Sequence, residues 1–463
     1  MTWLVIGLVA FGSAPDRRAA AAPADVARPN LLLIVLDDVG VDLVGAYGTG
    51  SGQMACTPSL NFFAERGLLF RNAWSDPVCS PTRAQILTGR HGFRTGVGTF
   101  VNGKSPPHFA GLPPAETTLP EILSAAGYST ALFGKWHLAS GNADPADPLT
   151  HGFDWFDGSI PGTLDPEVPC PSCPPGCQSG GLGYDLWVKS LNGAESCDER
   201  YATSANVDDA LATLGGPALP EPWFAVTSFN AIHSPFHEPP EELCLGKPNC
   251  ACSATLSQPD EKARAALEAA DREIRRLVVG LREASERQLF VFLVGDNGTP
   301  GPVANGAPGG CFDPGRSKGT VYQGGVHVPL MVWNPGIPKG SVDALVSTTD
   351  LFATLAELAG TTAEAEDSIS LTPYLEGFSG SLRSTVFAET FEPNGLPFAP
   401  TLHDRAIRDD RFKLIRTMGA TDELYDLASD PCEANDLYPP PPGSEAASAW
   451  QDLDAELAAM GVG

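Results

Sequence analysis

A short stretch near residue 80 combines a reactive side chain with the start of a helix. The sequence there reads Cys79-Ser80-Pro81-Thr82-Arg83. Ser80 suits an N-cap and Pro81 suits the first helical position, so we predict a helix that begins here. The unpaired N–H groups of a helix start attract anions, and Arg83 shares a helical face with Cys79. A guanidinium beside a nucleophile suits a substrate with several anionic oxygens, so the pattern indicates a catalytic site for such a substrate. The alternative is an ordinary buried cysteine beside a solvated arginine.

Polar side chains directly follow four apolar runs, each of which is typical of a buried parallel strand. The runs span residues 30–36, 128–133, 223–229 and 289–294. The polar residues after them are Asp37 and Asp38, then Lys135 and His137, then His233, and finally Asp296 and Asn297. Ligands of α/β sheets bind beyond the carboxyl ends of the strands. We therefore expect these side chains to meet at one edge of a sheet.

Four of these residues offer only oxygen ligands of the kind that hard cations prefer. They are Asp37, Asp38, Asp296 and Asn297. Carboxylates that are packed together repel one another, so their burial requires a cation. Carboxylate and amide oxygens favour Ca²⁺ or Mg²⁺ over zinc. The alternatives are a polar strand end at Asp37 and a simple turn at Asp296.

The longer stretch CSPTRAQILTGR, residues 79–90, resembles the signature of the type I sulfatases of the alkaline phosphatase superfamily. The resemblance implies that a separate formylglycine-generating enzyme oxidises Cys79 to formylglycine, an aldehyde that works as its hydrate. Gly-Lys-Trp-His at 134–137, Ile-His-Ser-Pro around His233 and the segment that contains Lys318 resemble further motifs of this family. The similarity extends from about residue 30 to residue 437.

The resemblance also implies roles for individual residues. Asp37, Asp38, Asp296, Asn297 and the formylglycine oxygen at position 79 would bind the metal. Because the ligands are oxygens and the chain is predicted to be secreted, we expect Ca²⁺, with Mg²⁺ as the alternative. The implied catalytic residues are Cys79, Arg83, Lys135, His137, His233 and Lys318. Among them, Arg83 and the two lysines would contact the sulfate, His137 would act on the hydrate, and His233 or Lys318 would protonate the leaving alcohol.

Three further positions carry weaker expectations. His237 lies close to His233 and is a second candidate for its role, and Ser159 is a candidate to reach the sulfate. His327 precedes Val328 and Pro329, at a position where the family usually has arginine. We therefore expect one contact that supports the site to differ from the family's pattern.

The resemblance implies an arylsulfatase-like sulfuric ester hydrolase that acts on a sulfate monoester of a small molecule or saccharide. Two alternatives remain open at this point. One is a phosphonate or phosphate monoester hydrolase of the same superfamily. The other is a non-catalytic sulfate-ester binder in which Cys79 remains a thiol.

Charge and the N-terminal sequence restrict partners and location. The chain of 463 residues has a formal net charge of −27, which argues against nucleic acid as a partner. An anionic substrate therefore needs a locally cationic pocket. Residues 3–11 are apolar and are followed by an alanine-rich stretch, so we predict a signal peptide over 1–27, although no Lys or Arg precedes the apolar run. The run is too short for stable membrane insertion, and we expect a secreted or periplasmic protein.

Six of the eleven cysteines lie in two clusters, at 170–177 and 244–252. Their C-x-x-C spacing could bind zinc, but the proline-rich sequence and the signal-like start favour disulfides. Ten cysteines remain after Cys79 is set aside, which is consistent with five bridges. Free thiols at Cys56, Cys311 or Cys432 are the alternative.

The alternation of strand-like runs with helical patterns predicts an α/β fold with a large, mostly parallel sheet between helices. We assign it to a catalytic domain over 28–381, with a Cys-rich insertion at 161–197. Short strand patterns and a helical stretch at 448–460 predict a small C-terminal domain over 382–463, with an antiparallel sheet and a terminal helix.

Overall fold

The computed structural model describes residues 28–50, 54–102, 108, 110–141, 144–164, 177, 183–214, 216–244, 256–306, 311–363 and 365–462. The predicted signal peptide lies outside these residues, as do Cys170, Cys173, Cys250 and Cys252. Among the described helices, none has the length and apolar character that crossing a bilayer requires.

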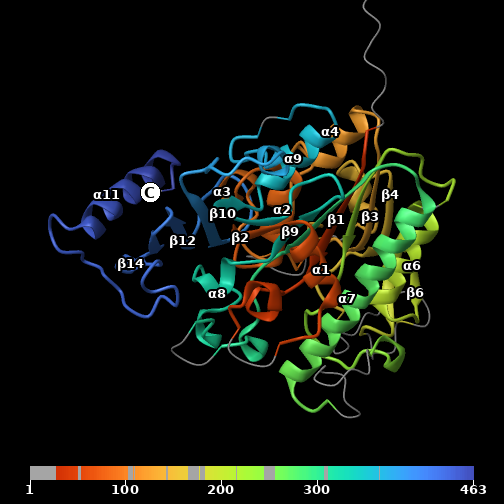
Figure 1. Ribbon diagram of the computed structural model, residues 1–463, viewed down its shortest axis with the longest axis horizontal. Coiled ribbons are helices and arrows are strands. Elements are labelled where there is room, and N and C mark those ends of the chain that lie inside the picture. Colours follow the sequence, from red (N-terminus) through yellow and green to blue (C-terminus); the bar gives the residue numbers. More distant parts are fainter. Residues whose placement is uncertain are drawn as a thin grey trace, which may run out of the picture.

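A ten-stranded sheet runs through the larger part of the molecule (Figure 1). Its strands are β1 (Asn30–Leu36), β2 (Leu68–Trp74), β3 (Ser129–Lys135), β4 (Trp155–Ser159), β5 (Trp187–Leu191), β6 (Ala194–Asp198), β7 (Trp223–Ser228), β8 (Leu289–Gly295), β9 (Leu330–Trp333) and β10 (Gly340–Ser347). They are ordered β10-β2-β9-β8-β1-β7-β3-β4-β5-β6. Neighbours from β8 to β4 pair in parallel, as do β10 and β2, whereas β9, β5 and β6 run antiparallel to their neighbours. The predicted, mostly parallel sheet is confirmed.

Helices cover both faces of this sheet because β1 and its neighbours are apolar on both sides. Leu32 and Ile34 of β1 pack in a core with α1 (Pro58–Arg66), α6 (Ala202–Leu214) and α7 (Pro259–Ala284). The opposite core holds Leu31 and Leu33 together with α2 (Cys79–Thr88), α4 (Leu119–Ala125), α9 (Asp350–Leu358) and α10 (Thr372–Leu375). Alternate residues of a strand point to opposite faces, so a continuous apolar run fills both cores. The described residues of this part also form short α-helices at α3 (Gly92–Thr95), α5 (Asp147–Thr150) and α8 (Gln323–Val326).

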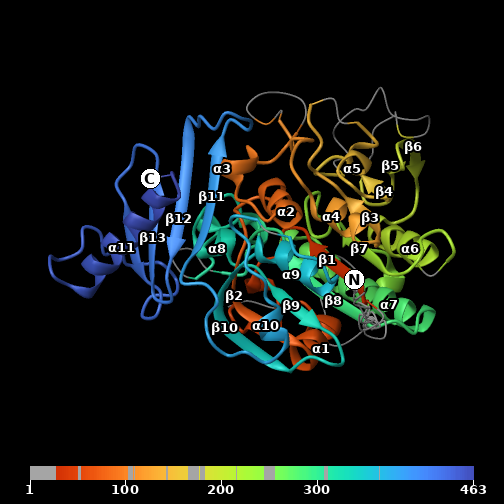
Figure 2. The same cartoon turned by 90° about the horizontal axis from the view of Figure 1, so that it is seen from above.

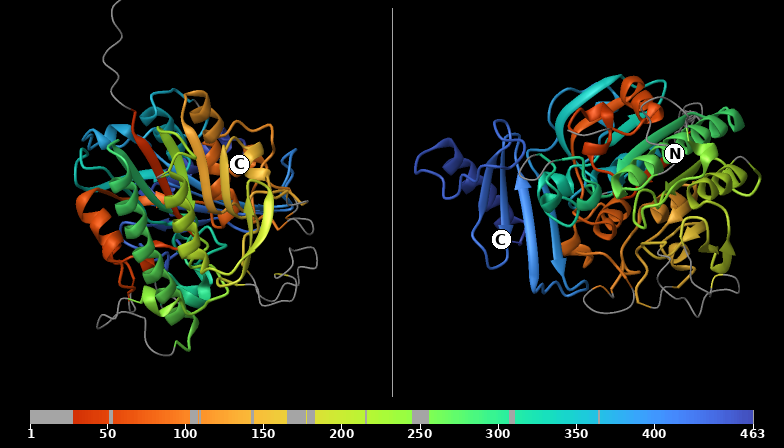
Figure 3. Two further views of the ribbon diagram at one scale, coloured as in Figure 1. Left: turned by 90° about the vertical axis from the view of Figure 1, so that its right-hand side faces the viewer. Right: turned by 90° about the horizontal axis from the view of Figure 1, so that it is seen from below.

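A second, four-stranded antiparallel sheet stands beside the larger part (Figures 2 and 3). It consists of β11 (Val386–Glu392), β12 (Leu402–Arg408), β13 (Phe412–Thr417) and β14 (Glu423–Asp426), in that order. The terminal helix α11 (Glu445–Ala459) packs Leu453 and Leu457 on one face. The other face buries Trp74 and Val326 of the larger part. The predicted antiparallel sheet and terminal helix are confirmed, whereas the domain boundary at residue 382 stays a prediction.

Disulfides join both nearby and distant segments of the chain. Cys177 is bonded to Cys197 at the edge of the large sheet, and Cys311 is bonded to Cys432, 121 residues later. Cys56 and Cys244 are also disulfide-bonded. The alternative of free thiols at Cys56, Cys311 or Cys432 is therefore wrong, because chain segments that the sequence separates widely meet in the fold. Among the described cysteines, Cys79 is the free one.

Candidate active site

The four polar clusters predicted from the sequence meet at one edge of the large sheet. The strands that carry them, β8, β1, β7 and β3, are consecutive neighbours. Their parallel register pairs Leu36 of β1 with Gly295 of β8, and Gly134 of β3 with Ser228 of β7, so the strands end at the same level. Asp37, Asp38, Lys135, Asp296 and Asn297 are all buried there.

Helix α2 begins at Cys79 itself, which differs from the sequence-based expectation. Val78 occupies the N-cap position without a side-chain hydrogen bond, so the prediction of Ser80 as the N-cap is wrong. The Ser80 hydroxyl instead donates to the carbonyl of His137 at 2.9 Å and accepts from the N–H of Val101 at 3.0 Å. It lies inside the first turn, where it joins three segments of the chain around Cys79.

Two lysines approach the Cys79 sulfur. Nζ of Lys135 lies 3.6 Å and Nζ of Lys318 lies 3.9 Å from Sγ. Lys135 forms a 2.5 Å ion pair with Asp37, and Lys318 pairs with Asp38. Burial raises the pKa of the Cys79 thiol, against the opposing effect of Lys135. The unmodified side chain is therefore a neutral thiol, which is a weak nucleophile.

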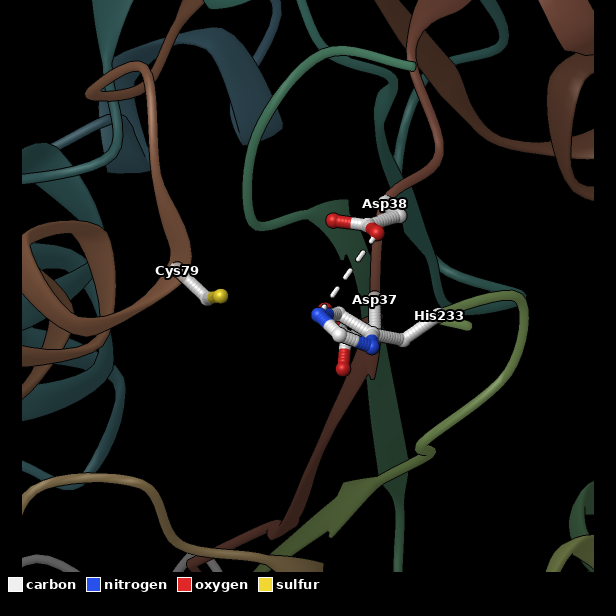
Figure 4. Close-up of side chains that lie close together, drawn as sticks. All are labelled: Asp37, Asp38, Cys79 and His233. Atoms are coloured by element: carbon white, nitrogen blue, oxygen red, sulfur yellow. Dashed lines mark ion pairs between the residues drawn. The ribbon is translucent and has the colours of Figure 1, made fainter. Parts of the chain in front are cut away.

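The side chains around Asp37 fit the requirements of a metal cation. Asp37, Asp38, Cys79 and His233 present potential ligand atoms within 4.8 Å of one another, and Figure 4 shows Cys79 directed toward the other three. Oδ1 of Asp37 and Oδ1 of Asn297 are buried without a hydrogen-bond partner, which is costly unless a cation binds them. Burial and the neighbouring Asp296 raise the pKa of Asp37 to about 8, and the attraction of Lys135 offsets this rise only in part.

Asp38 forms hydrogen bonds through both its backbone and its side chain. Its N–H donates to Oδ1 of Asp296 at 3.1 Å, and Nδ2 of Asn297 donates to its Oδ1 at 2.8 Å. Burial alone would raise the pKa of Asp38, but Lys318, His233, Lys135 and the hydrogen bond from Asn297 together outweigh it and lower that pKa to about 2. Asp38 also has a φ of 64°, in the left-handed region that non-glycine residues rarely occupy. Its surroundings therefore hold both its charge and its strained backbone in place.

Arg83 lies behind the carboxylates and does not line the cavity described below. Its Nε and Nη2 donate to Oδ2 of Asp296 at 3.0 and 2.7 Å. Its Nη1 donates to the carbonyl of Lys135 and to the hydroxyl of Ser228. Direct contact between Arg83 and sulfate stays a prediction, and the observed contacts favour a role in orienting Asp296.

A cavity of about 510 Å³ opens above Cys79. Cys79, His137, His233 and Lys318 are the predicted site residues that line it. His233 is 18% exposed, and its Nε2 lies 3.9 Å from Oδ2 of Asp38. His137 has an Nδ1 that is buried without a partner, and burial together with Lys135 lowers its pKa well below the usual value. The sequence therefore identified the polar floor of this cavity.

The three weaker candidates lie elsewhere. His237 stacks on Tyr184, with ring centroids 3.7 Å apart, and does not line the cavity. Ser159 is buried and accepts from Nδ2 of Asn230 at 3.2 Å. Nε2 of His327 lies 2.7 Å from the carbonyl of Arg71, outside the cavity lining.

Two residues that hold the site were missed by sequence reasoning. The Tyr184 hydroxyl lies 2.5 and 2.8 Å from the carbonyl oxygens of Asn230 and His233, so it fixes the loop after β7. Asn230 follows a strand-like run, as the predicted residues do, and that signal was available. Tyr184 lies in the region predicted as an insertion, where no local pattern marks it.

Comparison with known families and proteins agrees with this geometry. A family model described as Sulfatase matches residues 29–361, which is more than half of the chain. A second model, described as N-sulphoglucosamine sulphohydrolase, C-terminal, matches residues 310–460.

Curated relatives include sulfatases of animals. The chain is 32% identical to N-acetylgalactosamine-6-sulfatase of Homo sapiens over 75% of this chain and 66% of that protein. It is 32% identical to arylsulfatase A of Bos taurus over 81% of this chain and 72% of the relative. The chain spans slightly less than two thirds of the first of these relatives.

Solved structures share the fold at lower identity. Ps i-CgsB in complex with k-i-k-neocarrahexaose has a TM-score of 0.75 and 22% identity, covering 94% of this chain and 92% of that one. BT4656 in complex with its substrate D-glucosamine-2-N,6-O-disulfate has a TM-score of 0.67 and 20% identity, covering 94% and 97%. From its match to the family model and the relatives above, this chain belongs to the sulfatase family.

Proposed function

We propose that this protein hydrolyses a sulfate monoester through formylglycine formed from Cys79, with a divalent cation bound beside it. The observation that carries the proposal is the position of Cys79 at the floor of the cavity, next to two lysines and the carboxylate cluster. The names of the relatives support sulfate esters as the substrate class.

Asp37, Asp38, Asp296 and Asn297 would hold the cation, which we propose to be Ca²⁺, with Mg²⁺ as the alternative. Their donor atoms are oxygens, and two of these are buried without a partner. The cation would stabilise negative charge on the reacting oxygens, and formylglycine would supply the attacking hydroxyl as its hydrate.

The charge balance of the site supports an anionic substrate. Asp37, Asp38 and Asp296 are paired with Lys135, Lys318 and Arg83 respectively. Three negative groups therefore meet three positive ones, and a divalent cation would leave the site with a net positive charge. Such a site attracts a sulfate ester although the whole chain carries −27.

Residues that line the cavity, together with Lys135 beside it, would move protons and hold the sulfate. Nζ of Lys135 and Nζ of Lys318 would donate hydrogen bonds to its oxygens. Lys318 and His233 line the cavity, and one of them would protonate the leaving alcohol. His137 lines it too, and its lowered pKa leaves it neutral, so it would accept the proton from the hydroxyl at position 79 when sulfate departs.

We also place this activity outside the cytosol, in the periplasm or secreted. The bonds Cys177–Cys197 and Cys311–Cys432 support an oxidising compartment, where disulfides form and persist.

The mass of the peptide that contains residue 79 tests the proposal. The full chain is produced with and without a formylglycine-generating enzyme, and activity on 4-nitrophenyl sulfate is measured for both. We expect activity to follow the aldehyde content of the peptide, and Cys79→Ala to be inactive at an unchanged melting temperature. Active protein whose peptide contains only the thiol would refute the formylglycine route.

A series of esters with one shared leaving group distinguishes sulfate hydrolysis from phosphonate and phosphate hydrolysis. The same protein is assayed on 4-nitrophenyl esters of sulfate, phosphate and phenylphosphonate, which share one leaving group. We expect the sulfate to have the highest kcat/KM. A higher value for the phosphonate or the phosphate would reassign the reaction, and binding without turnover of any ester would indicate a non-catalytic binder.

A further inference from the structure

We propose that the cavity selects an apolar alcohol that carries a single sulfate, and that Phe100 is the residue that stacks on it. The inference rests on the proposed function and concerns the part of the substrate that leaves. It assigns a specificity role to a side chain outside the polar floor.

The wall of the cavity above Cys79 is mostly apolar. Its apolar side chains are Val78, Phe100, Val101, Ala139, Ile160 and Pro161. Small-molecule sites commonly combine such a wall with a few polar groups that fix orientation. The titratable groups of the lining, Cys79, His137, His233 and Lys318, belong to the proposed sulfate end, and Asn102 and Thr163 are its other polar side chains. The Thr163 hydroxyl already donates to the carbonyl of Ser234 at 3.1 Å. Most of the remaining wall is hydrocarbon, and burying apolar surface there favours an apolar ligand.

Phe100 presents an aromatic surface to this cavity. Its ring stacks on His108, with centroids 4.1 Å apart and planes inclined by 21°. Phe100 nevertheless remains 40% exposed, so part of the ring is accessible to a ligand. Aromatic rings prefer offset-stacked or edge-to-face geometry. The accessible part of the Phe100 ring therefore offers a ligand's aromatic or apolar group a contact of defined orientation.

The segment that carries Phe100 is fixed on both sides. Before it, the N–H groups of Gly98 and Thr99 both donate to Oδ1 of Asn394 at 2.9 Å. After it, the N–H of Val101 donates to the hydroxyl of Ser80 at 3.0 Å. Phe100 is therefore held between the loop after β11 and the helix that starts at Cys79. A pre-positioned ring loses little conformational entropy when a ligand binds.

The charge of the wall argues against a substrate with several anionic groups. Among the described residues that line the cavity, Lys318 is the one lysine or arginine, and it is paired with Asp38. A polysulfated sugar would need additional cations for its other sulfates, and the chain charge of −27 repels it. Some relatives are named for a sulfated sugar, so the inference separates this chain from them.

Two primary alkyl sulfates test the inference, because their leaving groups are similarly basic and differ mainly in polarity. They are 2-phenylethyl sulfate and N-acetylgalactosamine 6-sulfate, assayed with the full chain in its formylglycine form and Ca²⁺. We expect a higher kcat/KM for 2-phenylethyl sulfate. In Phe100→Ala, we expect the ratio of the two kcat/KM values to fall by about 2- to 10-fold, as for one lost aromatic contact.

Phe62→Ala is the matched control. Phe62 is a similarly exposed phenylalanine on α1 that does not line the cavity, so the ratio should stay at the wild-type value. A ratio that favours the sugar sulfate in the wild type, or that is unchanged in Phe100→Ala, overturns the inference and leaves the proposed function intact. Hydrolysis of neither ester, nor of 4-nitrophenyl sulfate, by protein with an aldehyde at position 79 overturns the proposed function itself.

Discussion

The lysines beside Cys79 are held by carboxylates that would themselves bind the cation. Lys135 pairs with Asp37 and Lys318 pairs with Asp38, so the position of each ammonium group depends on a metal-site residue. A lysine on a flexible stem gains a defined place in this way. Sulfate binding and cation binding are therefore expected to depend on each other.

His233→Ala should slow esters of poor leaving groups much more than nitrophenyl-type esters. A basic alcohol needs a general acid, which typically contributes about 10²–10⁴-fold, whereas a nitrophenolate needs little protonation. The measurement is kcat/KM across aryl sulfates of graded leaving-group pKa. His237→Ala is the control, because His237 lies nearby without lining the cavity. An unchanged dependence on the leaving group in His233→Ala would assign the acid role to Lys318.

Arg83→Lys should weaken cation binding and should not change how activity depends on the leaving group. Lysine cannot reproduce the two-pronged contact of Arg83 with Asp296, and losing a group that orients a metal ligand typically costs about 10–100-fold in metal affinity or activity. Activity is measured against Ca²⁺ concentration, and we expect the curve to shift to higher Ca²⁺. Lower activity with an unshifted curve would instead support the direct contact with sulfate that the sequence predicts.

At the scale of elements, β11 of the second sheet is bound to the segments on either side of α2. The N–H of Glu389 donates to Oδ1 of Asp76 at 2.9 Å, just before α2. Oε1 of Glu389 accepts from the N–H of Phe93 at 2.7 Å, and its Oε2 lies 2.8 Å from Nε2 of His403. This contact places a buried carboxyl group between the two sheets.

Glu389→Gln should make stability less dependent on pH. Burial raises the pKa of Glu389 from its ordinary value near 4.5 to about 8, so the folded state holds a proton that the unfolded state releases. Stability is therefore lost as the pH rises from about 4.5 to about 8, by up to about 1.4 kcal/mol per pH unit for one group. Glutamine removes this contribution and keeps the neutral hydrogen bonds.

The measurement is the urea unfolding midpoint from pH 5 to pH 8, for the wild type, Glu389→Gln and the control Glu376→Gln, which changes an exposed glutamate. We expect a shallower decline and a higher midpoint at pH 8 for Glu389→Gln alone. Parallel curves for all three proteins would show that Glu389 is ionised in the folded state.

At the scale of the whole molecule, the acidic chain and the carboxylate cluster both favour a bound cation. Chelation should abolish activity, and Ca²⁺ should restore it and raise the melting temperature. A ligand at 100 times its Kd stabilises the folded state by about 2.7 kcal/mol. Asp37→Asn should reduce both effects of Ca²⁺. Full activity after exhaustive chelation, with no metal detected, would contradict the cation site.

The sequence by itself determined the large sheet and the polar floor of the site. Each apolar strand run and the polar residues after it are local patterns, and parallel strands bring their carboxyl ends to one edge. Asp37, Lys135, His233 and Asp296 could therefore be predicted to meet without knowledge of any side-chain contact.

Only the tertiary structure decided what each side chain does at that edge. The hydroxyl of Ser80 bonds to His137 and Val101 instead of capping its helix, and Arg83 lies behind Asp296 instead of in the cavity. Cys311 and Cys432 meet across 121 residues, and Phe100 is held by the loop after β11. Such contacts depend on segments that are far apart in the chain, so no local periodicity or motif predicts them.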